Sequence, residues 1–149
     1  MACLCVCELH CKVDKNKIYF AVGLGCALLF LILALALSSW RCGTVLDTCL
    51  NGESKESYRT VGALLFCAIL VNLVAFTIVI VGCMTSFYWT TPVALGLTWI
   101  GGILALAGIA FYFDKLDPTY SPLLAVVGMS FTWAIAITIS ITMIHERVF

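Results

Sequence analysis

The sequence has 149 residues, of which 63% are hydrophobic and only 11% are charged, with a mean hydropathy of +1.12. A water-soluble domain carries charge on about a quarter of its residues, because its surface faces water, so the composition excludes a soluble globular domain. The formal net charge is zero and no basic stripe is present, which excludes a nucleic-acid partner.

The charged residues gather in four short stretches, 8–17, 41–59, 114–117 and 145–147, and apolar runs separate them. Each run is long enough to cross a hydrocarbon core about 30 Å thick at about 1.5 Å per residue. We therefore predict an all-α membrane protein, a four-helix transmembrane bundle forming one domain over 1–149. The expected spans are 18–39, 61–85, 92–113 and 123–144, joined by a head (1–17), a first outer loop (40–60), a turn (86–91), a second outer loop (114–122) and a tail (145–149).

The head carries Cys3, Cys5, Cys7 and Cys11 beside the entry to the first span. Cysteines in this position favour reversible palmitoylation. Zinc binding by these thiols and His10 is the alternative, but the spacing C-x-C-x-C-x-x-H-C does not match a structural zinc pattern. We expect lipidation rather than a metal site, with unmodified thiols as the third reading.

The first span ends in Ala-Leu-Ala at 34–36, which has the small-x-small form of a signal-peptide cleavage site. A signal-peptide core is only about 7–15 residues long, and this apolar run is longer. We therefore expect the segment to remain as a span.

The first outer loop is the only long polar segment, and it holds Trp40, Cys42, Cys49 and Arg59. The two cysteines are candidates for a disulfide in an oxidising compartment, which would stabilise a small closed loop by about 2–3 kcal/mol. About twenty residues allow one β-hairpin at most. The loop then either presents a rigid surface to a partner or simply links two spans, and the spacing fits both.

One strongly polar side chain, Asn72, lies inside an apolar run, on a helical face shared with Ala68, Ala75 and Gly82. An amide in lipid needs a partner, and such hydrogen bonds between helices are worth about 0.6–2 kcal/mol. We predict a packing contact within the bundle rather than a transport site.

Small residues recur at helical spacing in the third and fourth spans, which allows another backbone to approach closely. We expect internal helix packing, with any surplus face available to a partner. The residues concerned are Ala94, Gly101, Ala105 and Gly108 in the third span and Gly128, Thr132, Ala136 and Ser140 in the fourth.

Four spans put both termini on one side of the membrane. The basic residues tie, with Lys12, Lys15, Lys17 and Arg147 on the terminal side and Arg41, Lys55, Arg59 and Lys115 on the loop side. The lysines before the first span favour a cytoplasmic head. The Cys42 and Cys49 pair suits an oxidising lumen and the clustered thiols of the head suit a lipid-modifying cytosol, so we expect both termini in the cytoplasm. We expect an integral protein of the plasma membrane.

Trp40, Cys42, Cys49 and Arg59, together with the short turn and the aromatic end of the third span, resemble the claudin and peripheral myelin protein superfamily. The resemblance implies a disulfide between Cys42 and Cys49. The first loop is shorter than is usual in that family. The resemblance therefore implies a claudin-like protein with a shortened first loop, which packs against other membrane proteins rather than building a paracellular pore.

The function expected is a non-enzymatic scaffold, either a cell-junction component or an auxiliary subunit of a channel or receptor. Its partners would be membrane lipids and other integral membrane proteins, including like copies, with no cofactor and no small-molecule substrate. An oligomeric channel or small transporter is the alternative. A membrane-embedded glutathione or lipid enzyme is less favoured, because no Arg, Lys, Asp or Glu lies within a span.

Overall fold

The computed structural model describes residues 15–37, 55–85, 87–115 and 122–148. They form the helices α2 (Lys15–Ala36), α3 (Lys55–Thr85), α4 (Thr90–Lys115) and α5 (Leu123–Val148). All four helices are long and apolar enough to cross a membrane. The predicted all-helical, four-span architecture is therefore confirmed for the described part of the chain, and the chain is an integral membrane protein.

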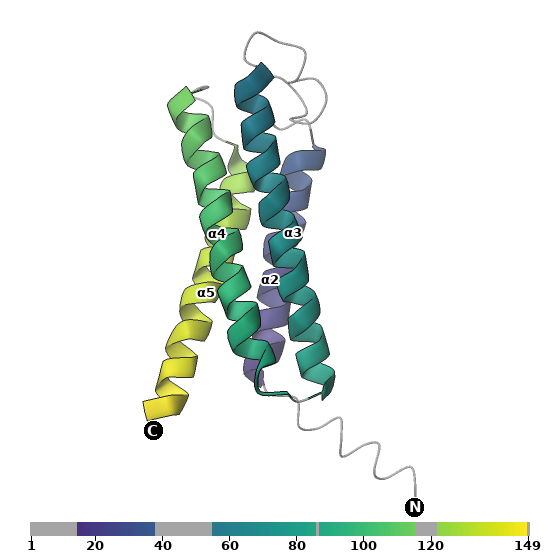
Figure 1. The fold of residues 1–149 in the computed structure, drawn as a ribbon, viewed down its shortest axis with the longest axis vertical. Helices are drawn as coiled ribbons and strands as arrows, with labels where there is room; N and C mark the ends of the chain where they lie inside the picture. The colour runs from purple at the N-terminus through teal and green to yellow at the C-terminus, as the bar shows by residue number, and fades with distance from the viewer. Residues whose placement is uncertain (1–14, 38–54, 86, 116–121, 149) are drawn as a thin grey trace, which may run out of the picture.

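The helices run up and down along one long axis (Figure 1). The most extensive interface joins α3 to α4, while α2 packs against both α5 and α3, and α4 also packs against α5. Each helix therefore has two neighbours. The beginning of α2 and the end of α5 lie at the same end of the bundle, which we call the terminal end, and the opposite end is the outer end.

All four helices extend beyond the apolar runs. The α2 helix starts at Lys15 rather than at 18, inside the predicted head. The α3 helix starts at Lys55 rather than at 61, so 55–60 belong to a helix and not to the first outer loop. The α4 helix continues to Lys115, and α5 continues through the predicted tail to Val148. Hydropathy marks only the part of a helix that lies in lipid, whereas backbone hydrogen bonds continue until the sequence stops them. At about 1.5 Å per residue the 31 residues of α3 exceed a 30 Å hydrocarbon core.

The α4 helix begins at Thr90, inside the predicted turn 86–91. The hydroxyl of Thr90 donates a hydrogen bond to the carbonyl of Phe87 at 2.8 Å, which ties the first residue of α4 to the preceding turn. Pro92 then falls in the first turn, where its missing N–H removes no helical hydrogen bond. The connection between α3 and α4 is therefore tight, and it brings the aromatic residues 87–89 to the terminal end.

The core consists of two apolar clusters along the bundle axis. One cluster, which includes Leu31, Leu65 and Tyr112, fills the half nearer the outer end. The other cluster, centred on Phe20 and Val79, fills the half nearer the terminal end. Large apolar side chains also cover the outside of the bundle, as expected for helices that face lipid.

Candidate functional site

Asn72 of α3 is fully buried and lies flat against Gly101 of α4. A Cβ atom at Gly101 would lie 2.6 Å from both amide heteroatoms of Asn72, so only glycine leaves room for this contact. Neither Nδ2 nor Oδ1 has a hydrogen-bond partner among the described residues. The side chain thus lies between α3 and α4, and the expected interhelical hydrogen bond is not seen within the described helices.

The small residues of α4 face α3. Ala94, Gly101, Ala105 and Gly108 are all buried. A Cβ atom at Gly108 would lie 3.3 Å from Cβ of Leu64 on α3. This stripe therefore builds the most extensive interface of the bundle.

The predicted stripe of α5 also points inward. A Cβ atom at Gly128 would lie 2.8 Å from Cγ of Leu31, so this glycine admits the side chain of α2. Thr132 and Ala136 are buried, and Ser140 is half-buried. The structure thus places both predicted stripes inside the bundle, and neither is the surplus face that a partner could reach.

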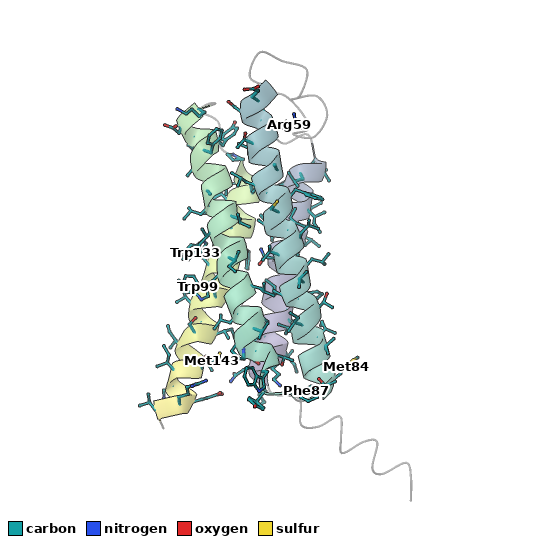
Figure 2. All side chains as sticks on the ribbon, in the orientation of Figure 1. Arg59, Met84, Phe87, Trp99, Trp133 and Met143 are labelled. Atoms are coloured by element: carbon teal, nitrogen blue, oxygen red, sulfur yellow. The ribbon has the colours of Figure 1, made fainter. Side chains whose placement is uncertain are left out.

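Two tryptophans join α4 to α5, a contact that the sequence analysis missed. Trp99 donates from Nε1 to the hydroxyl of Ser140 at 3.2 Å, and Trp133 donates to the carbonyl of Gly102 at 3.2 Å. Their rings meet edge to face with centroids 5.1 Å apart, along the α4–α5 boundary (Figure 2). The available signal was an indole N–H in the middle of a span, where a hydrogen-bond partner has to be found.

A second small-residue stripe on α5 faces outward, and the sequence analysis also missed it. We call Ser130, Ala134 and Thr138 the outer α5 stripe, and all three are exposed. Residues two positions apart lie about 200° around a helix, so this stripe is opposite Gly128 and Thr132. The signal for it was the same spacing of four, displaced by two residues.

The polar groups of the outer α5 stripe are satisfied within its own helix. Ser130 donates to the carbonyl of Val126 at 2.8 Å, and Thr138 donates to the carbonyl of Ala134 at 2.7 Å. The stripe therefore presents no unsatisfied hydroxyl to lipid, and the larger exposed side chains of Ile137 and Ile141 lie along it. The exposed face of α3 also carries large side chains, Phe66 and Leu73 among them.

A cleft of about 740 Å³ opens at the terminal end of the bundle, between the start of α2, residues 88–93 and the last turns of α5. We call it the terminal cleft. Asn16, at the start of α2, donates from Nδ2 to Oε1 of Glu146 at 3.0 Å, which ties α2 to the end of α5. Lys17 donates from Nζ to the carbonyl of Gly82 at 3.3 Å, and Arg147 adds a second cation to the cleft lining.

The rest of the cleft lining is largely aromatic and aliphatic. Tyr88 and Trp89 enter from the α3–α4 connection, and Val93, Ile139 and Met143 enter from α4 and α5. Figure 2 shows Met143 on the part of α5 near this end of the bundle. The cleft therefore joins a charged rim to an apolar wall.

The cysteines of the head (Cys3, Cys5, Cys7 and Cys11), His10 and the loop residues Trp40, Cys42 and Cys49 all lie outside the described residues. Arg59 is described, and it projects from α3 near the outer end (Figure 2). Next to it, the buried Tyr58 packs edge-on against Tyr112, with ring centroids 6.4 Å apart. In the described helices no three His, Cys, Asp or Glu side chains form a group that could hold a metal ion.

Comparison of the chain with family models, with curated proteins and with solved structures gives no match.

Proposed function

We propose that this chain is a non-enzymatic membrane protein that packs laterally against a transmembrane helix of another integral membrane protein. In this role it is a cell-junction or membrane-organising component, or an auxiliary subunit of a channel or receptor. The observation that carries the proposal is the outer α5 stripe of Ser130, Ala134 and Thr138, which is exposed at the middle of a span.

Small residues matter for association in lipid because lipid tails are as apolar as leucine, so burial of apolar surface gives helices no driving force to associate. Close backbone approach and van der Waals packing supply it instead. Within the bundle, Gly101 and Gly128 allow such a close approach between neighbouring helices. The outer α5 stripe has the same spacing on a surface that none of the described helices covers, and it suits a helix from another protein.

The finer features of the proposal combine the positions of the lysines and cysteines with the resemblance to claudins and peripheral myelin proteins. Both termini are placed in the cytoplasm at the plasma membrane, and the head is anchored there by acylation of its cysteines. A Cys42–Cys49 disulfide then holds a short extracellular loop near Arg59. The common position of the beginning of α2 and the end of α5 supports this arrangement (Figure 1).

The test compares two identical substitutions at exposed alanines. Ala134→Leu fills the outer α5 stripe, whereas Ala107→Leu alters the exposed face of α4, and neither adds volume inside the bundle. Proteins that co-purify with the wild type in mild detergent are identified and then quantified for both variants. We expect a several-fold loss of the specific partner for Ala134→Leu alone.

Size-exclusion chromatography and tryptophan fluorescence verify that both variants remain folded. Equal recovery of every co-purifying protein from the two variants would overturn the assignment of this face. A loss confined to Ala107→Leu would move the interface to α4.

A further inference from the structure

We infer that the terminal cleft binds the headgroup of an anionic aminophospholipid, a lipid with a phosphate, a carboxylate and an ammonium group, such as phosphatidylserine. The inference does not depend on the proposed lateral partner, but it rests on the proposed cytoplasmic position of the terminal end. It rests on the charges of the cleft, on its apolar wall and on its depth in the bundle.

Two cationic side chains, Lys17 and Arg147, line the cleft. Lys17 lines the cleft from the start of α2, and its Nζ donates a hydrogen bond to the carbonyl of Gly82, close to the end of α3. Arg147 lines the same cleft from the last turn of α5. Basic pockets between membrane helices on the cytoplasmic side are suited to anionic lipid headgroups. Two cations from two different helices can hold one phosphate between them.

The carboxylate of Glu146 narrows the ligand class. It lines the cleft beside the two cations and accepts the hydrogen bond from Asn16. A headgroup with only negative groups would meet repulsion from it, whereas a headgroup ammonium would pair with it. Two cations and one carboxylate leave the side chains with a net charge of +1. A headgroup with two anionic groups and one ammonium is the matching complement.

The apolar wall indicates a lipid rather than a soluble phosphate ester. Ile139 lies seven residues before Glu146 on α5, about 10 Å nearer the middle of the bundle. Val93 of α4 comes four residues after Trp89 and likewise lies nearer the middle of the bundle. An acyl chain can therefore follow the wall inward while the headgroup stays at the rim. Tyr88 and Trp89 are exposed at this end, as aromatic residues are at a membrane interface.

The size of the cleft agrees with this occupant. Its volume of about 740 Å³ falls within the range of about 300–1,000 Å³ found for small-molecule sites. The cleft is partly open to its surroundings, and Figure 1 shows the last turns of α5 diverging from the other helices at this end. A phospholipid can enter laterally without unfolding the bundle.

The experiment measures lipid retention by native mass spectrometry. The full chain is released from nanodiscs of phosphatidylcholine that contain equal amounts of phosphatidylserine, phosphatidylglycerol and phosphatidylethanolamine. We expect one phosphatidylserine per chain to be retained in preference to the other lipids. Arg147→Gln should lower this retention about fivefold, the effect of one basic residue near an anionic lipid surface. Arg59→Gln, the same change at the outer end, should leave it unchanged.

Glu146→Gln tests the ammonium contact separately. Glutamine keeps an oxygen that can accept the hydrogen bond from Asn16, but it carries no charge to pair with an ammonium. The preference for phosphatidylserine over phosphatidylglycerol should therefore disappear in this variant. Equal retention of phosphatidylcholine by the wild type, or equal losses for Arg147→Gln and Arg59→Gln, would overturn the inference. Displacement by glycerophosphoserine at the concentrations at which the lipid binds would show a soluble headgroup site instead.

Discussion

The contact between Asn72 and Gly101 can be tested by adding a single methyl group. Gly101→Ala places a Cβ atom 2.6 Å from Nδ2 and Oδ1 of Asn72 and 2.7 Å from its Cγ. Ordinary contacts begin at 3.4 Å, so the whole planar amide has to move or the helices have to separate. Overpacking of this kind costs about 1–3 kcal/mol.

A matched control isolates this cost from the higher helix propensity of alanine. Gly96, on the same helix, is exposed, and a Cβ atom there would meet nothing within 4 Å. Gly96→Ala should therefore leave stability unchanged or raise it by up to about 1 kcal/mol. The difference between Gly101→Ala and Gly96→Ala should be about 1–3 kcal/mol, with Gly101→Ala the less stable variant.

Repeating both substitutions in an Asn72→Ala background completes a double-mutant cycle. Without the amide, Gly101→Ala should behave like Gly96→Ala, giving a coupling energy of about 1–3 kcal/mol between positions 72 and 101. The assay is reversible unfolding by sodium dodecyl sulfate in mixed micelles, followed by tryptophan fluorescence. An equal cost of Gly101→Ala with and without Asn72 would refute the assigned contact.

Three further predictions concern the packing of α4 and α2 against α5 and the topology of the chain. Trp133→Phe removes the hydrogen bond to the Gly102 carbonyl and should lower the free energy of unfolding by about 0.6–1.7 kcal/mol in the same assay, whereas Trp89→Phe at the exposed connection should not. Gly128→Leu should separate α2 from α5 by collision with Leu31, and should abolish the monodisperse peak in size-exclusion chromatography. In intact cells, a membrane-impermeant thiol reagent should label the cysteines of the first outer loop only after reduction; labelling of the head cysteines instead would invert the proposed topology.

The four spans could be predicted because the length of an apolar run is a direct measure of the lipid it crosses. Hydropathy could not show which side of each helix points into the bundle and which side faces lipid. Ser130, Ala134 and Thr138 have the same spacing as Gly128, Thr132 and Ala136, and a helix that is apolar all around gives no hydropathy signal for its inner side. In the structure Leu31 of α2 packs on Gly128, so the stripe that contains Gly128 is the inner one.

The terminal cleft was beyond sequence reasoning for a different reason. Its walls come from residues far apart in the chain, Asn16, Trp89 and Glu146 among them. Only the packing of α2 and α4 beside α5 brings these segments together. The helical continuation of α5 to Val148 was also hidden, because polar residues after an apolar run look like a tail although their backbone hydrogen bonds continue.

We propose that a transmembrane helix of another protein lies on the outer face of α5. The most direct measurement is photocrosslinking in native membranes with benzoylphenylalanine at position 137, in line with the outer α5 stripe, and at position 103 on α4. Ile137 and Ile103 are matched sites, because they are 46% and 54% exposed. We expect a discrete protein adduct from position 137 and only lipid adducts from position 103. Lipid adducts alone from both positions would contradict it.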